Sequence, residues 1–481
     1  MRKRFEQQMT MGVEPIAEVK IRLKSRDEMP PILLALQTIF ITPKLSEIIF
    51  SILEEKICKG KKDTGRTGMD LWHILVLSVV RHACNTNWDK LHRYANTDIE
   101  MRKIMGLHST DFYNDFYEFE YQNILDNVSL LDAETINKIN ATVGEYGLTL
   151  LKKKEQEGLQ LKADSFVVKT NVHFPTDLNL LYDSLRKTLC CIQHLQFTNP
   201  SICDGWRKIK SIKKETKKIF RSCSWYVFKG KKEDVKKHMV RQYLAQANNI
   251  LNRAKTLLAV SLDEDLKYYT DYVALFINQI DRRLLQGQTI LAEEKVYSIF
   301  EPHTEWINKG KRQPELGNTV LITTNQYHLI MDYKIMFNEK DASQIVPLID
   351  RLKTNYPNQI IDSISTDKGF YSKENFAYVV NAEIPKVIMP KKGKLNKKEY
   401  EREHESGFIK LRNKHSAVES NINMLEHHGL DCCVDKGKPS LERYVALSVL
   451  AYNFHIIGNE LIKIKRKKEQ KEQELFLNQA A

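Results

Sequence analysis

The feature that most constrains the fold is a short hydrophobic segment with an acidic residue inside it. In the stretch LKADSFVVKTNVHFPTD, residues 161–177, the β-branched and aromatic residues at 166–170 predict a buried strand. Asp164 lies within that strand, where an isolated charge is costly without partners or a ligand. Thr176 or Asp177 can then cap a helix, because leucines recur at helical spacing after them. We therefore expect a strand that carries a functional carboxylate and leads into a helix.

Two further acidic residues are placed where they can join Asp164. Asp367 follows a strand-like segment at 360–366, at the kind of strand end where open α/β sheets bind ligands. Glu419 lies on a predicted helix, on the polar face next to the apolar stripe. The polar face comprises His415, Glu419, Asn423 and Glu426, and the apolar stripe comprises Val418, Ile422 and Leu425.

Three converging carboxylates repel one another unless a dication lies among them, and oxygen ligands select Mg²⁺ or Mn²⁺. We expect two such ions, because a pair activates the attacking hydroxyl of a phosphodiester reaction and stabilises the leaving oxygen. Asp164, Asp367 and Glu419 are thus the predicted catalytic and metal-binding residues.

Other residues remain alternatives. Asp332 and Asp362 are also on predicted strands, where each either replaces a member of the trio or is an ordinary edge residue. Asp177 either caps its helix or binds metal. His303, in FEPHTEWINKGK, either approaches DNA or belongs to a structural turn.

The order of predicted elements indicates a mixed α/β fold. The segments 320–324 and 327–336 resemble the two strands of a hairpin, with a turn at Asn325–Gln326. After the hairpin we expect helices and strands in alternation: a helix at 342–355, a strand at 360–366, a helix at 372–380 and a strand at 385–389. A Lys-rich loop from Lys391 and one long helix to Gly429 complete this part. With the first strand this gives a mixed five-stranded sheet, interrupted after that strand by a large helical insertion.

Helical patterns account for most of the remaining chain. Three short helices between 69 and 107 have helix-turn-helix character, and their cations either follow DNA phosphates or solvate helix faces.

We expect the chain to divide into six segments. They are a loosely held polar arm at 1–26, a helical N-terminal DNA-binding domain at 27–135, a linker helix and first catalytic strand at 136–185, a basic helical insertion at 186–291, the rest of the catalytic domain at 292–430, and a C-terminal helix with a basic tail at 431–481.

Charge favours a polyanionic partner. The chain has 74 Lys and Arg against 61 Asp and Glu, a formal net charge of +13. Residues 207–237 carry 13 basic and three acidic residues, interleaved with aromatic ones, which suits a phosphate backbone with bases stacked beside it; the alternative is a solvated helix face. The predicted DNA contacts are Lys213, Lys214, Lys217, Lys218, Lys309, Lys311, Arg412, Lys414 and His415.

A second pattern in the insertion bears on assembly. Its apolar residues recur at nearly heptad spacing, which is typical of a helix pair or a dimer, although such a stripe is more often internal core. The stripe comprises Leu266, Tyr269, Val273, Phe276, Ile280 and Leu284.

Membrane insertion and nucleotide binding are not expected. The longest apolar run, around 71–80, is too short to span a bilayer, and the eight cysteines lie at no zinc-like spacing and are expected to be reduced. The loop Gly60–Gly68 imitates a phosphate-binding loop, but Arg66 replaces the lysine and a helix precedes it, so we expect no nucleotide cofactor. We predict a cytoplasmic protein.

Four motifs, in order, carry a family resemblance: ADSFVVKTNVHFPTD, EEKVYSIFEPHTEWINKGK, STDKGFYS and HSAVESNINMLEHHGL. Together with the helical segment from Gly65 to Leu107, the chain resembles DDE-type insertion-sequence transposases, in particular the group called ISNCY, from about residue 65 to 460. The resemblance implies a ribonuclease H-like fold in which Asp164, Asp367 and Glu419 are the triad. It also implies a prokaryotic, nucleoid-associated enzyme that binds transposon ends and target DNA as a homodimer and performs metal-dependent cleavage and strand transfer.

One departure from the family pattern is visible. Related transposases often carry basic residues four before and seven after the catalytic glutamate, where this chain has His415 and Glu426. Arg412 or Lys414 then takes over the phosphate contacts. The remaining alternatives are an inactive or domesticated relative that only binds DNA, and a ribonuclease H-like nuclease without strand transfer.

Overall fold

The computed structural model describes residues 2–7, 10–24, 26–60, 68–109, 116–152, 154, 157–203, 205–308 and 313–480, with side chains described up to 474. The described chain forms two compact units. Unit 1 comprises Met1–Thr170 and Gly317–Ala481, and unit 2 comprises Asn171–Leu316.

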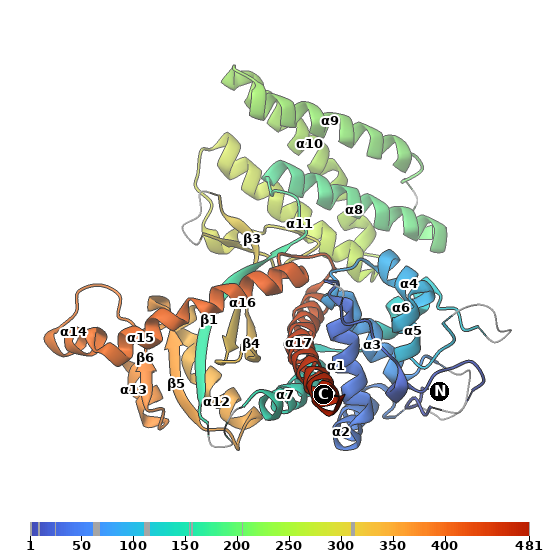
Figure 1. Cartoon of the computed structure of the whole chain (residues 1–481). Coiled ribbons are helices and arrows are strands. Elements are labelled where there is room, and N and C mark those ends of the chain that lie inside the picture. Colours follow the sequence, from blue (N-terminus) through green and yellow to red (C-terminus); the bar gives the residue numbers. More distant parts are fainter. Residues whose placement is uncertain are drawn as a thin grey trace. The chain divides into compact units, whose positions relative to one another are not determined.

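A mixed, open sheet organises unit 1 (Figure 1). Its strands are β1 (Leu159–Thr170), β3 (Glu315–Thr324), β4 (Ile330–Met336), β5 (Ile361–Thr366), β6 (Lys386–Ile388) and β7 (Cys432–Cys433); β2 (Glu305–Ile307) is the seventh strand of the sheet. The strands run in the order β2-β3-β1-β5-β6, with β4 also paired to β3 and β7 to β1. The five strands expected from the sequence are therefore all present, with two short additional ones.

The sheet combines antiparallel and parallel pairs. β1 is antiparallel to β3, and β3 is antiparallel to β4, as a hairpin requires. β5 and β6 run parallel to β1 and to each other. Parallel neighbours need crossover connections, and the helices α12 (Ile345–Asn355) and α13 (Lys373–Asn381) supply them.

Alternation along the strands divides the side chains between two cores. Leu161 and Ala163 of β1 and Ile364 of β5 belong to a large cluster that includes α12 and α13. Phe166 and Val168 of β1 belong to a second cluster with α16 (Ala417–Leu425) and α17 (Lys438–Ala480). One face of β1 thus belongs to the cluster that includes α12 and α13, and α16 packs on the opposite face.

Helices make up the rest of unit 1. They are α1 (Met29–Ile41), α2 (Pro43–Ile57), α3 (Leu71–Ala83), α4 (Trp88–Thr97), α5 (Ile99–Ile104), α6 (Tyr121–Val128) and α7 (Ala133–Leu151), with short helical turns at Ile16–Glu18, Asp341–Gln344, Lys368–Phe370 and Glu426–Leu430. The break between α1 and α2 lies just before Pro43, the first residue of α2, since proline favours the first turn of a helix. Helix α17 packs against α1, α3 and α7.

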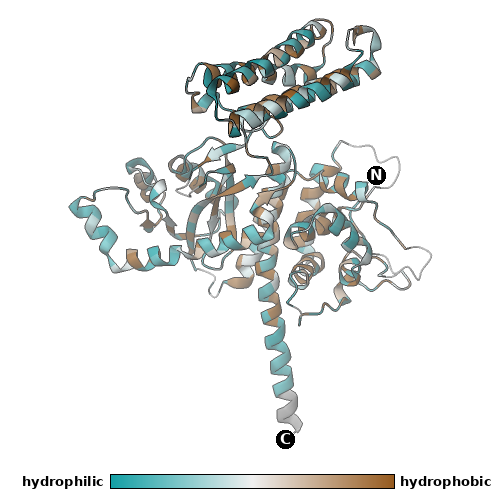
Figure 2. Cartoon of the chain, turned by 90° about the horizontal axis from the view of Figure 1, so that it is seen from above, coloured by the Kyte–Doolittle hydropathy of each residue, from teal (hydrophilic) through white to brown (hydrophobic). Residues whose placement is uncertain are grey.

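Helix α17 is apolar for much of its length and turns hydrophilic toward the C terminus (Figure 2). Among the described residues, one helical segment, Lys438–Glu474, is long and apolar enough to span a membrane. Helices α1 and α2 also pass this test if the bent pair is counted as one span. In α17, 72% of the apolar window is buried inside the protein. The core helix of a soluble protein has the same properties, and α17 is compatible with that role.

The N-terminal segment differs from the loosely held arm expected from its polar composition. Ile16 is fully buried, and Val19 and Ile21 are nearly so. The amide of Gln37 donates to the carbonyl oxygens of Ile16 and Val19, at 2.7 and 2.9 Å. Three apolar side chains thus fix a segment that composition alone assigned to solvent.

Unit 2 is a helical bundle. Its elements are α8 (Asp177–Thr198), α9 (Ile209–Lys229), α10 (Glu233–Leu258) and α11 (Glu264–Ile280), with short turns at Pro200–Cys203, Asp281–Leu285 and Ala292–Glu294. The stripe considered as a dimer surface is internal: Leu266, Val273, Phe276 and Ile280 are buried in one cluster with Leu244 and Leu251 of α10. The interface interpretation of that stripe is wrong.

The prediction of a single long helix up to Gly429 is also wrong. The segment forms α14 (Lys397–His404), α15 (Ser406–His415) and α16, separated at Glu405 and Ser416. Glu405 has extended dihedral angles, whereas Ser416 keeps helical ones. The chain therefore turns between α14 and α15 but passes from α15 to α16 with little change of direction.

Candidate carboxylate site and basic surfaces

Strand pairing brings Asp164 and Asp367 together. In the parallel pair β1–β5, Ala163 is opposite Thr366, so the next residues, Asp164 and Asp367, are adjacent across the two strands. Asp367 has extended dihedral angles, with φ −71° and ψ 165°, which continue the strand geometry. Both side chains lie on the face opposite Ala163 and Ile364, the face that α16 covers.

Helices α15 and α16 bring two further groups to this edge. His415, the last residue of α15, places its Nε2 atom 3.5 Å from Oδ1 of Asp367. Its side chain is 12% exposed, whereas that of Asp367 is 66% exposed. Because Ser416 is helical, Glu419 follows His415 by about one turn and lies on the adjoining surface of α16.

Burial of the apolar stripe fixes the orientation of α16. Val418, Ile422 and Leu425 are in the same cluster as Phe166 and Val168 of β1, so the helix packs directly on the strand that carries Asp164. Glu419, one residue after Val418, is exposed beside that contact. The amphipathic pattern therefore buries Val418 against β1 and leaves the neighbouring Glu419 exposed to solvent.

Asn421 anchors α16 and was missed by the sequence analysis. It is buried, and its amide donates to Oγ1 of Thr324 at the end of β3, at 3.1 Å. Its Oδ1 atom accepts from the hydroxyl of Tyr452 on α17 and is 2.9 Å from Nδ1 of His328. An asparagine between two residues of an apolar helix stripe was the available signal.

Lys162 is a second residue that the sequence analysis missed. It is two residues before Asp164 on the same face of β1, and its side chain is buried. Burial lowers the pKa of Lys162, and the charge of Lys414 on α15 lowers it further. A lysine inside a predicted strand, two residues before a candidate carboxylate, was the signal for it.

The donor set suits a hard cation, because it consists of carboxylate oxygens at a solvent-accessible edge. As the side chains stand, no group of three or more His, Cys, Asp and Glu residues within the described ranges forms a metal cluster. The ring nitrogens of His415 can still bind a further group, because both are buried and, apart from the 3.5 Å approach of Nε2 to Asp367, form no hydrogen bond in the described part of the chain. Such groups are satisfied by water or ligands.

The rival acidic residues have other partners. Asp332 is buried and accepts two hydrogen bonds from Arg351, at 3.0 and 2.7 Å. Asp362 pairs with Lys386 on the neighbouring strand, at 3.1 Å. Asp177 pairs with Arg283 at 2.9 Å, while Thr176, rather than Asp177, caps α8 by accepting from the Asn179 amide.

His303 and several predicted basic contacts also have definite positions. The side chain of His303 is only 6% exposed, with Nε2 3.6 Å from Oε2 of Glu301, which favours the structural turn. Arg412 and Lys414 are exposed on α15. Lys309 and Lys311 lie outside the described residues.

The basic cluster on α9 divides into two kinds of lysine. Lys214, Lys217 and Lys218 are exposed. Lys213 instead points to α8, where its ammonium donates to Oε1 of Gln193 at 2.7 Å. Trp225 and Phe228, further along the helix, are 54% and 61% exposed. Three of the four predicted lysines are therefore available to a partner.

Comparison with known proteins gives no match: no family model, no curated protein and no solved structure matches this chain.

Proposed function

We propose that this chain is a DNA transposase of the DDE type, which cleaves the ends of an insertion sequence and joins them to target DNA. The observation that carries the proposal is the β1–β5 register, which makes Asp164 and Asp367 neighbours on the face covered by α16. Glu419 on α16 completes the proposed triad.

The strand order supports a ribonuclease H-like core. Numbered in chain order without the two short strands, the sheet is 3-2-1-4-5, with only the second strand antiparallel to the others. The hairpin β3–β4 and the crossover helices α12 and α13 fit that fold. Unit 2 is inserted between the first and second of these strands, as the family resemblance implies.

Each residue of the proposed site has a distinct part. Asp164 and Asp367 present their oxygens from adjacent strands, and Glu419 faces them from the helix. Bound Mg²⁺ or Mn²⁺ would activate the attacking hydroxyl and stabilise the leaving oxygen. His415 orients Asp367, and Lys414 and Arg412 supply positive charge for the phosphates on the same helix.

A relative that only binds DNA is the second candidate. It is favoured by His415 and Glu426, which stand where related transposases often carry basic residues. In that case the basic surfaces would bind DNA while the carboxylates would have no catalytic role. A homodimer on DNA belongs to the transposase proposal, since two ends must be joined.

A cleavage assay separates the two candidates. The purified chain is incubated with a plasmid that carries the DNA flanking its gene, in Mg²⁺ and in EDTA. Mg²⁺-dependent nicks at the boundaries of the element, followed by joined products, are expected. Binding to these fragments without any cleavage in Mg²⁺ or Mn²⁺ would favour the DNA-binding relative.

A further inference from the structure

A basic loop leaves the sheet beside the candidate site. Residues 391–398, KKGKLNKK, contain four lysines besides Lys391 in a run of eight positions and no acidic residue. We call this segment the basic loop. Lys392, Lys394, Lys397 and Lys398 are exposed, and none of these four forms an ion pair within the described part of the chain.

The register places the basic loop at the same edge as the carboxylates. In the parallel pair β5–β6, Ser365 is opposite Ile388, so Asp367 is level with Pro390. The basic loop starts at the next residue, Lys391. Asp164, Asp367 and Pro390 thus occupy successive positions across β1, β5 and β6, and the lysines follow immediately on the β6 side.

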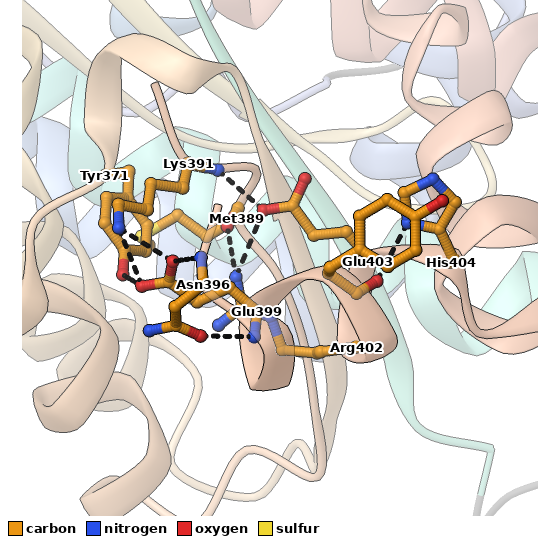
Figure 3. A network of polar contacts seen from close by, with 9 residues as sticks. Tyr371, Met389, Lys391, Asn396, Glu399, Arg402, Glu403 and His404 are labelled. Atoms are coloured by element: carbon orange, nitrogen blue, oxygen red, sulfur yellow. Dashed lines mark hydrogen bonds and ion pairs between the residues drawn. The ribbon is translucent and has the colours of Figure 1, made fainter. Parts of the chain in front are cut away.

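A network of polar contacts holds the start of the basic loop (Figure 3). The ammonium of Lys391 pairs with Glu399 on α14 at 2.7 Å, and this cation lowers the pKa of the Glu399 carboxyl. The backbone amide of Lys391 donates to the buried carboxylate of Glu403 at 2.9 Å. Lys391 therefore serves as an anchor, and the four exposed lysines keep their charge for another partner.

The same network fixes the far end of the basic loop. Asn396 and Glu399 form a reciprocal cap of α14, with two hydrogen bonds of 2.8 Å. Only four residues, 392–395, lie between the two fixed points. Gly393 within them has φ +91°, which only glycine adopts without strain. The backbone of the basic loop is thus held in one path.

The network also joins the loop after Asp367. The hydroxyl of Tyr371 donates to Oε1 of Glu399 at 3.4 Å, and Tyr371 is four residues beyond Asp367. Arg402 lies over the ring of Phe376 on α13, 4.4 Å from its centroid. The segment that carries the candidate carboxylate and the segment that carries the lysines are therefore fixed to each other.

We infer that the basic loop binds the phosphate backbone of the DNA strand that passes Asp367 on the β6 side. This inference rests on the proposed function, because it takes DNA as the substrate of the neighbouring carboxylates. Charge complementarity carries it: four unpaired cations face solvent, and their backbone is fixed before binding, which reduces the entropic cost of association. An anionic membrane fits less well, because Leu395 is the one large apolar residue of the basic loop.

The test compares two variants of the full chain with equal loss of charge. The first carries Lys392→Gln, Lys394→Gln, Lys397→Gln and Lys398→Gln. The control carries Lys465→Gln, Lys467→Gln, Lys468→Gln and Lys471→Gln on the exposed end of α17. Glutamine retains helix propensity at these positions. Circular dichroism verifies that both variants are folded.

Binding is measured with a 30-base-pair duplex of arbitrary sequence at several salt concentrations without divalent metal. The log–log salt slope of the first variant should be flatter by about 0.9 for each phosphate that the variant no longer neutralises, and thus by roughly two to four units for two to four phosphates. An unchanged slope, or an equal change in the control, would overturn the inference. So would tighter binding of the wild type to anionic phospholipid vesicles than to the duplex.

The outcome is distinguishable from failure of the proposed function. Duplex binding without metal does not depend on the three carboxylates. If the four-lysine variant has a flatter salt slope but the wild type never cleaves DNA, the basic loop is a DNA-binding surface and the transposase proposal is wrong. If the wild type cleaves DNA but the variant has an unchanged salt slope, the transposase proposal stands and the inference about the basic loop is wrong.

Discussion

Nε2 of His415 lies 3.5 Å from Oδ1 of Asp367, although 48 positions separate the two residues in the sequence. The contact joins the end of α15 to the end of β5. Glu419 follows His415 by about one helical turn, so the proposal that it joins Asp164 and Asp367 starts from this contact. The proposed triad depends on this contact for its third member.

The three carboxylates should be necessary for cleavage and dispensable for binding. Asp164→Asn, Asp367→Asn and Glu419→Gln each remove one oxygen charge from the site without changing the basic surfaces. We expect each to abolish nicking of transposon-end DNA in Mg²⁺ while a gel shift remains near wild type. Asp362→Asn on β5 is the matched control, because Asp362 pairs with Lys386 and should retain cleavage. Wild-type nicking in any of the first three would remove that residue from the site.

His415 should affect the rate of cleavage through Asp367. His415→Leu removes the ring nitrogen next to Oδ1, and loss of such an outer contact typically lowers activity roughly 10–100-fold. His415→Arg introduces a basic residue where the transposases that this sequence resembles often carry one, and should retain more activity than the leucine variant. Single-turnover cleavage rates measure both. Equal rates for leucine, arginine and wild type would show that the contact has no role.

The lysines of α9 should differ in their effect on DNA binding. Lys214→Gln, Lys217→Gln and Lys218→Gln together should flatten the salt slope by about 0.9 for each phosphate left without its cation, whatever the DNA sequence. Lys213→Gln alone should leave the slope unchanged, since its ammonium is bound to Gln193. Fluorescence anisotropy at several salt concentrations is the measurement. If the triple variant keeps the salt slope of the wild type, the lysine cluster is only a solvated helix face.

The apolar stripe of α11 should be essential for folding of unit 2. Val273→Glu with Phe276→Glu places two charges in a closed core, which costs several kcal/mol. We expect loss of helical circular dichroism. Lys267→Glu with Asn278→Glu, both on the solvent-facing side of α11, should keep the helical signal. A folded double core variant that becomes monomeric would restore the dimer interpretation.

Stability should decrease as the pH falls from about 6.5 toward 4. Burial lowers the pKa of His73 and of His455 to about 4, and also lowers the pKa of His82 and His428. The folded state keeps these rings neutral while the unfolded chain protonates them near 6.5, so stability is complete above that value and is lost below it. For His73, a shift of this size corresponds to about 3 kcal/mol.

The variant His73→Gln tests this sign. Its unfolding free energy, from urea titrations followed by tryptophan fluorescence, should fall less steeply between pH 6.5 and 4 than that of the wild type. His404→Gln is the control, because His404 is exposed. If His73→Gln and the wild type show the same dependence, His73 is not held neutral by its surroundings.

Local patterns predicted most elements and the identity of the candidate carboxylates. The strand around Asp164, the hairpin after Gly317 and the strand before Asp367 follow from β-branched runs between turns, and the break at Pro43 follows from its fixed φ. These features depend on neighbours in the sequence, so the sequence is sufficient for them. The same holds for the polar face of α16.

Features that depend on distant contacts required the tertiary structure. Asp164 and Asp367 are adjacent only because of the parallel register between β1 and β5. A shift of this register by one residue would place their side chains on opposite faces of the sheet. Burial of Ile16, Val19 and the α11 stripe depends on which surfaces meet, and periodicity alone does not distinguish core from interface. The division of lysines into Lys213, which bonds to α8, and the exposed Lys214, Lys217 and Lys218 depends on the packing of α9. The sequence by itself determined which side chains can do chemistry, and the tertiary structure decided which of them meet, because contacts between distant segments are selected by packing of the whole unit.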